Sequence, residues 1–439
     1  MNNTTRNIQK LRKNSLMRVL HAFAKTHEVQ LYLVGGSVRD LLLNRPTTDW
    51  DFTLESDAIQ FAKLFARSIR SPFVPLEKQL PTARVVIKTR RLAPTELDID
   101  FAQFRAATLT DDLLLRDLTI NAMAIPLESV MESDNPEVID PCNGRNDLAT
   151  RQLQFPSEQV ILNDPLRLMR IYRFAAQLDF EIPQKSIGLI QKHKRLLPQV
   201  SIERIRDEFL KILNVEKATP YLRQILEIGL FTPLFRNIIQ TNTLWQPLEN
   251  FEDNPIPETL SSYEDEIRTY LSEELGLYAN RRSLIKLCLL RQGNIIRIGE
   301  LLRFSKKARQ FLQCLVAGHR KLSNKELTKK QIIDFLRDSE SDWWGRLLCS
   351  AAVEPIPPEV LRKIVDTYYG HLLPILKQGQ LITGEDIIKK FRIKKGKKIG
   401  VLLEQIEEQQ FYGEIRTRDE ALAMVEALIH QEGNPYKSG

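Results

Sequence analysis

Two aspartates one residue apart, Asp49 and Asp51, follow shortly after a Gly-Gly pair in this chain. They alternate with Trp50 and Phe52, so the period of a β-strand places both carboxylates on one face and both aromatic rings on the other. Neighbouring carboxylates repel each other, and they stay ionised at low cost only where a cation lies between them. Mg²⁺ prefers oxygen ligands of this kind. The pair therefore predicts a magnesium site suited to phosphoryl transfer.

The glycine pair itself, Gly35 and Gly36, follows the apolar run 31–34, which predicts a short buried strand. Glycines let the backbone turn sharply there and approach a ligand closely. We expect Ser37 to cap a short helix after this turn, so that phosphate oxygens meet backbone amides at the positive helix end. The turn and the acidic strand together predict an enzyme that uses nucleotides.

A third carboxylate is available in LDIDFAQF, where Asp98 and Asp100 both project from the face opposite Ile99. Three acids can hold two metal ions, one that activates an attacking hydroxyl and one that neutralises a leaving pyrophosphate. An acidic strand edge or a helix-capping cluster is the structural alternative for either pair alone. The glycine turn next to them favours the metal site.

These motifs resemble those of the class II tRNA nucleotidyltransferases, which build the 3′-terminal CCA of tRNA, and of the related bacterial poly(A) polymerases. GGSVRD and DWD look like the first catalytic motif of that family. The resemblance implies that Asp49 and Asp51 are catalytic ligands of Mg²⁺. Asp100 is preferred to Asp98 as the third catalytic ligand, because the family usually has an acid followed by a short apolar and polar run there. The phosphates are expected near Gly35, Gly36 and Arg39.

The segment LLLRDLTINAMA is similar to the family's second motif, although Leu115 replaces the first arginine of that motif. The resemblance assigns Arg116, Asp117 and Asn121 to the sugar and phosphates of a bound nucleotide. Asp117 and Asn121 are four residues apart, so on a helix they would share a face and could bond a ribose hydroxyl. The structural alternative is an N-cap aspartate that begins an apolar helix.

The segment NDPLRLMRIYRFAAQLDF predicts a helix with Asp164 as N-cap and Pro165 in the first turn. Steps of three residues drift by roughly 60° on a helix, which places Asp164, Arg167 and Arg170 on one side and turns Arg173 away. An aspartate accepts and an arginine donates, so the pair can complement the Watson–Crick edge of a base. The resemblance implies that Asp164, Arg167 and Arg170 bind the nucleotide. It also implies that Asp164 and Arg167 act as a template that selects CTP or ATP.

Two further segments resemble family motifs without pointing to chemistry of their own. DPCNGRNDL contains the turn residue Gly144 and matches the element that joins the catalytic head to the neck. In VSIERIRDEFLKIL, Glu203 and Arg206 are spaced to pair on a helix, which would hold the template helix in place. Asn163 replaces the acid that usually precedes the template aspartate.

Strand patterns become rare beyond Arg151, which predicts an α/β head followed by helices. The resemblance implies a polymerase-beta-like palm with a mixed sheet, and then an all-α neck, body and tail. The expected domains are the nucleotidyltransferase head, the neck with the nucleotide template, the helical body and the tRNA-binding tail, at 1–152, 153–215, 216–370 and 371–439.

The body contains a segment that looks like the metal-dependent HD phosphohydrolase module of some family members. At the place of its His-Asp pair the chain has Arg291, Gln292, Gly293 and Asn294, so we expect no metal there and a structural role for His319.

The tail resembles that of bacterial family members. Its basic run is expected to bind RNA phosphates through Lys394, Lys395, Lys397 and Lys398.

Composition agrees with an RNA-binding protein, since the 439 residues carry a formal net charge of +7. The four cysteines show neither the spacing of a zinc site nor a disulfide framework, which favours a reducing cytoplasm.

No apolar run is long enough to span a membrane. The basic start, free of acids, raises an organelle transit peptide as a minor alternative. No pattern indicates a stable protein partner.

The sequence therefore predicts an enzyme that adds CMP from CTP to the 3′ end of tRNA. If it builds the complete CCA end, it also adds AMP from ATP. A poly(A) polymerase or an A-adding enzyme is the alternative with the same chemistry, and an inactive RNA-binding protein is the alternative of another class. Family members that make the whole CCA carry a flexible loop before the second motif. Here only residues 105–114 lie there, so we expect efficient addition of two cytidines and poor addition of adenosine.

Overall fold

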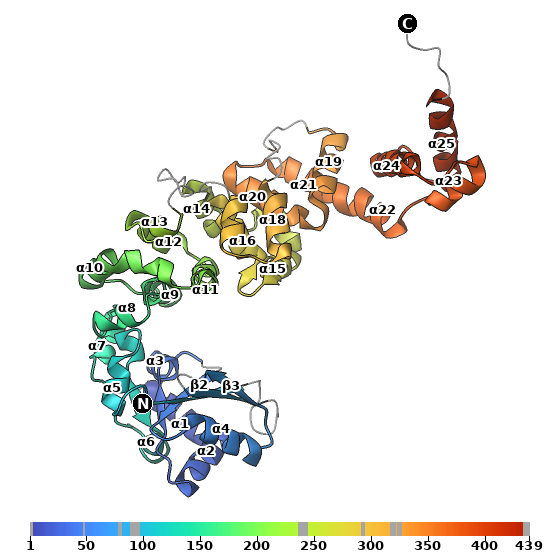
Figure 1. Ribbon diagram of the computed structural model, residues 1–439. Coiled ribbons are helices and arrows are strands. Elements are labelled where there is room, and N and C mark those ends of the chain that lie inside the picture. Colours follow the sequence, from blue (N-terminus) through green and yellow to red (C-terminus); the bar gives the residue numbers. More distant parts are fainter. Residues whose placement is uncertain are drawn as a thin grey trace. The chain divides into compact units, whose positions relative to one another are not determined.

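The computed structural model describes residues 3–46, 49–77, 81–87, 97–235, 245–290, 295–316, 322 and 327–432. The chain forms two compact units, Met1–Thr241 and Asn242–Gly439, whose elements are labelled in Figure 1. The first unit contains the sheet and every residue expected to bind metal or nucleotide. The division into head, neck, body and tail stays a prediction within these two units.

The described residues of the first unit form a six-stranded mixed sheet in the order β3-β4-β5-β2-β1-β6. Strands β2 and β5 run parallel, and the other neighbouring strands pair antiparallel. The strands are β1 Tyr32–Val34, β2 Asp49–Leu54, β3 Phe73–Glu77, β4 Thr82–Ile87, β5 Leu97–Gln103 and β6 Ala124–Pro126. The acidic pairs of the sequence thus lie on two adjacent parallel strands.

Helices pack against the sheet and continue beyond it in the first unit (Figure 1). The helices up to the one that directly follows β6 are α1 Asn3–Lys13, α2 Ser15–Thr26, α3 Gly36–Leu42, α4 Ala58–Ser68, α5 Leu109–Leu114, η1 Thr119–Asn121 and α6 Leu127–Glu132. Those that follow are α7 Gly144–Thr150, α8 Gln159–Asn163, α9 Arg167–Leu178, α10 Gln184–His193, η2 Lys194–Gln199, α11 Ile202–Leu213, α12 Thr219–Glu227 and α13 Thr232–Phe235.

An aromatic core fixes the orientation of β2 and β5. The rings of Phe61 and Phe65 on α4 pack edge-on against Phe101 of β5, which stacks on Phe52 of β2. Phe23 of α2 joins the same cluster. Burying these rings is strongly favourable, at about 1.5–3 kcal/mol for each fully buried side chain. Since residues alternate along a strand, the core holds the acidic face of both strands on the opposite side.

The second unit is helical, as expected, except for one two-stranded hairpin in its described residues, β7 Glu274–Gly276 and β8 Ala279–Asn280. Strands of two and three residues are too short for an alternating pattern to reveal. The first helices are α14 Gln246–Asp253, η3 Glu258–Tyr263, α15 Glu264–Ser272, α16 Arg281–Leu289, α17 Ile295–Leu301 and α18 Lys306–Val316. Next come α19 Lys329–Ser339, η4 Glu340–Asp342, α20 Trp343–Val353, α21 Pro358–Thr367, the π-helix η5 Tyr368–Leu372 and α22 Leu373–Gln378.

The last three helices, α23 Gly384–Phe391, α24 Lys397–Tyr412 and α25 Arg418–Glu432, enclose a small core of their own. Ile387, Ile406 and Val425, one from each helix, are among its buried residues. Across the described part of the chain, no helix is both long and apolar enough to cross a membrane.

Candidate active site

Asp49 and Asp51 lie on β2 with their carboxylates on one face, as predicted, because the aromatic residues that alternate with them are buried. The parallel pairing of β2 with β5 places Asp98 opposite Asp49 and Asp100 opposite Asp51. Four carboxylates therefore occupy two residue pairs of these strands, one on each side of the Trp50–Ile99 pair.

The electrostatics of this face favour a bound cation. Burial and then the Asp100 carboxylate raise the pKa of Asp51 to about 6, although Arg116 opposes the shift. Burial and the Asp98 carboxylate also raise the pKa of Asp49. A divalent cation among these groups would lower the free energy of their ionised forms. Their hard oxygen donors fit Mg²⁺.

The glycine turn lies directly beside the acidic strand. Gly35 has a φ of 65°. A Cβ at this position would lie 3.7 Å from Asp51 Oδ2 and 3.2 Å from Arg116 Nη1. Gly35 is itself the N-cap of α3, so the prediction of Ser37 as the cap was wrong. Ser37 Oγ instead accepts from the Asp51 backbone N–H at 2.8 Å and donates to the Asp49 carbonyl oxygen at 3.2 Å. Its hydroxyl ties the turn to the acidic strand.

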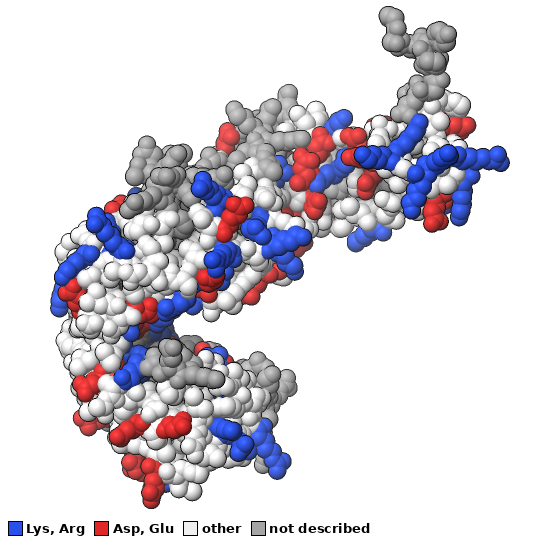
Figure 2. All heavy atoms as spheres, in the orientation of Figure 1, with Lys and Arg blue, Asp and Glu red and all other residues white. Residues whose placement is uncertain are grey.

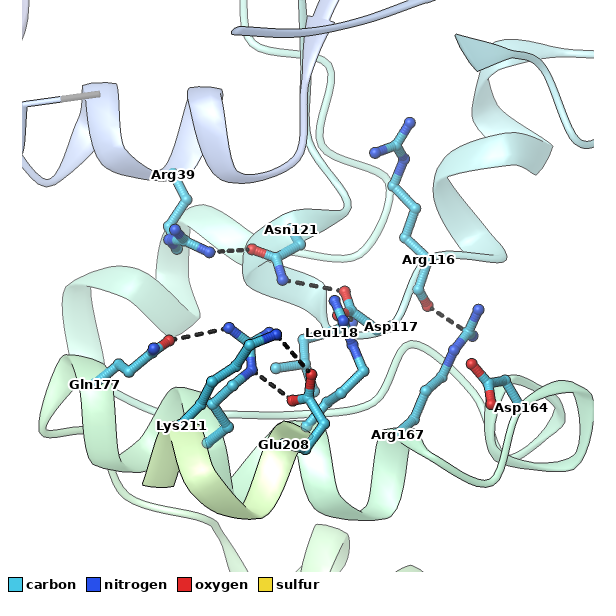
Figure 3. A network of polar contacts seen from close by, with 12 residues as sticks. Arg39, Arg116, Asp117, Leu118, Asn121, Asp164, Arg167, Gln177, Glu208 and Lys211 are labelled. Atoms are coloured by element: carbon cyan, nitrogen blue, oxygen red, sulfur yellow. Dashed lines mark hydrogen bonds and ion pairs between the residues drawn. The ribbon is translucent and has the colours of Figure 1, made fainter. Parts of the chain in front are cut away.

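Asp117 and Asn121 contact each other, with Asn121 Nδ2 donating to Asp117 Oδ1 at 3.0 Å (Figure 3). They do so without sharing an α-helix, because Asn121 ends the 3₁₀ helix η1 and Asp117 precedes it. Arg39 Nη1 donates to Asn121 Oδ1 at 2.8 Å. Arg170 donates to Asp117 Oδ2 through Nε at 2.9 Å and Nη2 at 2.5 Å. Hydrogen bonds thus connect α3, η1 and α9.

The charge state of Asp117 follows from this network. Burial alone would raise the pKa of Asp117, but the Arg170 guanidinium and the hydrogen bond from Asn121 outweigh it and lower that pKa. Asp117 is therefore an ionised acceptor at neutral pH, able to hold both donors in place.

A residue that sequence reasoning missed, Asp112, organises the approach to the second motif. It is 1% exposed on α5 and accepts from the Arg105 backbone N–H at 3.0 Å. It also accepts from Arg116 Nε at 3.2 Å and Nη2 at 3.0 Å. Thr108 caps α5 through the Asp111 backbone N–H, which is the local signal in the sequence. The burial of Asp112 depends on tertiary packing and has no such signal.

The template helix α9 begins at Arg167 with Leu166 as its N-cap, so the predicted start with Asp164 as N-cap was two residues too early. Asp164 instead ends α8 and accepts from the Leu166 backbone N–H at 3.2 Å. Arg167 Nη1 donates to the Arg116 carbonyl oxygen at 3.2 Å, with Asp164 beside it (Figure 3). Arg204 Nη2 on α11 donates to Asp164 Oδ2 at 2.8 Å. Asp164 is therefore held by α11, and Arg167 by the backbone of the second motif.

Arg173 was expected to turn away, but it lines the same cavity as the rest of the site. Its guanidinium lies 3.9 Å from the centre of the Phe174 ring, and its Nε donates to Glu208 Oε2 at 2.6 Å. Glu208 is 3% exposed on α11, and Lys211 also contacts it (Figure 3). The long arginine side chain reaches across the helix face to this carboxylate, which helical phase alone does not predict.

In the contacts described above, α11 thus supports α9 through Glu208 and holds Asp164, which precedes α9, through Arg204. Arg206 contacts Asp207 at 2.7 Å. The expected pairing of Glu203 with Arg206 stays a prediction.

The joining element, α7, packs tightly against η1. A Cβ on Gly144 would lie 2.2 Å from the Thr119 carbonyl oxygen. Asp140 accepts from the backbone N–H groups of Gly144 at 2.7 Å and Arg145 at 2.9 Å. The buried Asp147 accepts from Thr119 Oγ1 at 2.5 Å. Gly144 is thus required by close packing of two backbones.

We therefore expect Gly144→Ala to lower the free energy of unfolding by about 1–3 kcal/mol, because α7 must move away from η1. Gly188→Ala is the matched control, since nothing lies within 4 Å of a Cβ there and the position is inside α10. It should raise stability by about 0.5–1 kcal/mol. Urea unfolding followed by circular dichroism measures both, and equal stability of Gly144→Ala and the unsubstituted protein would contradict the packing argument.

A cavity of about 620 Å³ collects these elements, a size suited to a small-molecule ligand. It is lined by all the residues expected to bind metal or nucleotide, namely Gly35, Gly36, Arg39, Asp49, Asp51, Asp100, Arg116, Asp117, Asn121, Asp164, Arg167 and Arg170. Asp98 is not among the described residues that line it, which supports Asp100 as the third acid. Arg105, Arg173 and Phe174 line the cavity too, although the sequence does not predict them as part of the site.

The basic run of the tail is exposed around the start of α24. Lys394 and Lys395 precede the helix, and Lys397 and Lys398 lie in its first turn. Figure 2 shows Lys and Arg side chains gathered over this part of the second unit.

Residues 291–294 and His319 lie outside the described residues, so the expected lack of an HD-type metal site there stays a prediction.

Three family models match the chain. Residues 31–154 match the "Poly A polymerase head domain", residues 179–240 the "Probable RNA and SrmB- binding site of polymerase A", and residues 287–425 the tRNA nucleotidyltransferase domain 2. The first of these contains the glycine turn, the acidic strands and the second motif. The resemblance seen in the sequence is thereby confirmed.

Relatives match over nearly the whole length. A CC-adding tRNA nucleotidyltransferase of Geobacter sulfurreducens is 31% identical, with 89% of this chain and 90% of the relative covered. A CC-adding tRNA nucleotidyltransferase of Synechocystis is 29% identical, with 91% and 94% covered.

A solved structure of a CCA-adding enzyme in complex with CTP has a similar fold, with a TM-score of 0.70 at 22% identity, covering 97% of this chain and 98% of that one. This likeness confirms the expected fold class. Such enzymes use divalent metal ions as a family. With these matches added to the motifs in the cavity, the chain belongs to the family of tRNA nucleotidyltransferases that share the poly(A) polymerase head domain.

Proposed function

We propose that this enzyme transfers CMP from CTP to the 3′-hydroxyl of tRNA, and that it adds the two cytidines of the CCA end more efficiently than the final adenosine. The 3′ oxygen forms a bond to the α-phosphorus of the triphosphate, the bond from that phosphorus to the leaving oxygen breaks, and pyrophosphate is released. The observation that carries the proposal is that the paired acids and the Asp164–Arg167 pair line one cavity.

Asp49, Asp51 and Asp100 are proposed to hold Mg²⁺. When bound, the metal would favour ionisation of the attacking hydroxyl and neutralise charge on the leaving pyrophosphate. Ser37 fixes the backbone of the acidic strand through its two hydrogen bonds, so the carboxylates keep their places on the sheet. The identity of the ion as Mg²⁺ rests on the hard oxygen donors of the site.

The arginines around the glycine turn are proposed to bind the phosphates, since Arg39 and Arg116 line the cavity beside Gly35 and Gly36. A guanidinium suits phosphate oxygens because it donates several N–H groups in a fixed plane. Asp117 and Asn121, oriented by Arg170 and Arg39, offer an acceptor and an amide to the ribose hydroxyls. The nucleotide would then lie with its sugar between α3 and α9.

The base is proposed to meet Asp164 and Arg167. Cytosine presents an amino donor next to acceptors, so a carboxylate accepts from the amino group while a guanidinium donates to the acceptors. Arg204 and the Arg116 carbonyl oxygen hold the two side chains in the described structure. The same contacts restrict how far the pair can move.

The limited addition of adenosine is proposed from the segment between β5 and α5. Only residues 104–108 separate Gln103 from the start of α5, and Asp112 binds the Arg105 backbone N–H within it. A segment this short and this tightly bonded has little freedom to re-orient the template pair for ATP. The first relatives named above are CC-adding enzymes, which supports the same proposal.

Single-step kinetics test this part of the proposal. With tRNA that lacks its last three nucleotides and CTP, two additions should be fast. With tRNA that already ends in CC and ATP, we expect addition of adenosine to be slower by about 10²-fold or more, which corresponds to about 3 kcal/mol of transition-state free energy. Comparable rates for the two tRNAs would refute the CC-adding proposal and leave full CCA addition as the function.

The tail is proposed to bind tRNA through Lys394, Lys395, Lys397 and Lys398, because exposed lysines beside a helix N-terminus attract phosphates.

The division of the chain into head, neck, body and tail after residues 152, 215 and 370 is kept as a proposal for the functional domains. We also place the enzyme in the cytoplasm, a proposal supported by four cysteines that have neither the spacing of a zinc site nor that of a disulfide framework.

A further inference from the structure

Arg84, which no motif points to, contacts both acids of β5. It lies on β4 directly opposite Asp100. Its Nε donates to Asp100 Oδ1 at 2.8 Å and its Nη2 to Asp100 Oδ2 at 2.9 Å, while its Nη1 donates to Asp98 Oδ2 at 2.9 Å. One guanidinium therefore engages both oxygens of Asp100 and one oxygen of Asp98.

The position of Asp100 in this contact differs from the one a metal ligand needs. Among the described residues, no group of three histidine, cysteine, aspartate or glutamate side chains is arranged to hold a metal ion. Asp100 nevertheless lines the cavity and lies opposite Asp51. The carboxylate that would complete the site is held by a strand on its far side, since β5 lies between β4 and β2.

From this geometry we propose that Arg84 competes with the metal for Asp100. Resting on the function proposed above, the inference is that Asp100 leaves the Arg84 fork to join Asp49 and Asp51 when the metal binds. Arg84 then keeps its contact with Asp98, which is outside the cavity lining. Asp98 thus serves as the counter-ion of Arg84 and not as a ligand, which gives each acid of the LDID segment a separate role.

The exposure of Arg84 makes the exchange feasible, and its positive charge supports the competition with the metal. The Arg84 side chain is 37% exposed, so water can solvate the guanidinium while one of its partners leaves. The guanidinium also carries the same sign of charge as the metal, so its presence beside Asp100 lowers the affinity of the site for a cation. Removing it should therefore free a ligand and remove a repulsion at once.

Direct binding of Mn²⁺ to the full-length protein, without nucleotide or tRNA, tests the proposal. Electron paramagnetic resonance measures free Mn²⁺ during the titration. We expect Arg84→Ala to lower the dissociation constant about 10-fold, a change of the size that partners of metal ligands produce. Arg84→Lys, which keeps the charge but cannot engage both oxygens, should fall between Arg84→Ala and the unsubstituted protein.

Asp98→Asn should act in the opposite direction and weaken Mn²⁺ binding, because Arg84 then has no second carboxylate to keep when Asp100 leaves. Arg12→Ala is the matched control, since Arg12 forms an ion pair with Asp134 at 2.8 Å away from the site. It should leave the dissociation constant unchanged. The rise in melting temperature on adding Mn²⁺ should be larger for Arg84→Ala than for the control, which also shows that the variant is folded.

An unchanged or higher dissociation constant in folded Arg84→Ala would overturn the competition and assign Arg84 the task of orienting Asp100 for the metal. Failure of the proposed function would look different. If Asp49→Asn does not weaken Mn²⁺ binding, the acidic strand is not the metal site, whatever Arg84 does.

Discussion

Replacing Asp49 or Asp51 by asparagine is expected to reduce CMP incorporation into tRNA by about 10³-fold or more, while tRNA binding stays within about twofold. The metal supplies several kcal/mol of charge stabilisation in the transition state, and each 1.36 kcal/mol is a tenfold change in rate. The substitutions keep the shape of the side chain. They also keep the Ser37 bonds to the backbone of β2, so the fold should survive.

Stability separates this effect from unfolding. In the presence of EDTA, Asp51→Asn should melt at a higher temperature than the unsubstituted protein, because Asp51 is buried beside Asp49 and opposite Asp100. Asp134→Asn, at an exposed ion pair with Arg12, is the control and should retain full activity. Rates close to those of the unsubstituted enzyme in both Asp49→Asn and Asp51→Asn would show that the chemistry takes place elsewhere.

Loss of either template residue is expected to reduce the choice of CTP over UTP by about 10- to 100-fold. A complementary hydrogen-bonding edge contributes about 1–3 kcal/mol of discrimination between bases. In Asp164→Ala the acceptor for the cytosine amino group is gone, and in Arg167→Ala the donor is gone. Competition between the four triphosphates, with the product sequenced, measures the change.

Two controls keep this test specific. Arg204→Ala removes the partner of Asp164 without touching the base, so it should loosen selection less than Asp164→Ala does. Asp179→Asn changes the other end of α9, where Asp179 accepts from Tyr221 in a left-handed conformation that asparagine tolerates. It should change neither selection nor rate. Unchanged selection in both template variants would place base recognition at other residues.

Sequence alone predicted the parts of the site that depend on local geometry. Alternation along β2 is enough to place Asp49 and Asp51 on one face, because a strand has a fixed period and the aromatic residues between them must be buried. The choice between Asp98 and Asp100 could not be made that way, since both have the same phase. It needed the pairing of β5 with β2 and the cavity beyond it.

The residues that were missed act through contacts that form only when the chain folds. Asp112 is buried and accepts from the Arg105 backbone N–H and from the Arg116 guanidinium, seven and four residues away. Glu208 reaches Arg173 from another helix. Ser37 was misread as a helix cap because its hydroxyl has the right position for one, but the neighbouring strand offered both a donor and an acceptor. Each case depends on tertiary contacts that the order of residues does not reveal.

The cavity around Asp49 and Asp51 is expected to extend the 3′ end of tRNA with cytidine. The most direct measurement is to incubate the protein with Mg²⁺, all four triphosphates and a tRNA that lacks its last three nucleotides, and to sequence the 3′ ends of the products. We expect two cytidines on most molecules, little terminal adenosine, and no product with the Asp49→Asn protein. A run of adenosines would identify a poly(A) polymerase, and no extension at all would contradict nucleotide addition in this cavity and leave an RNA-binding protein without activity.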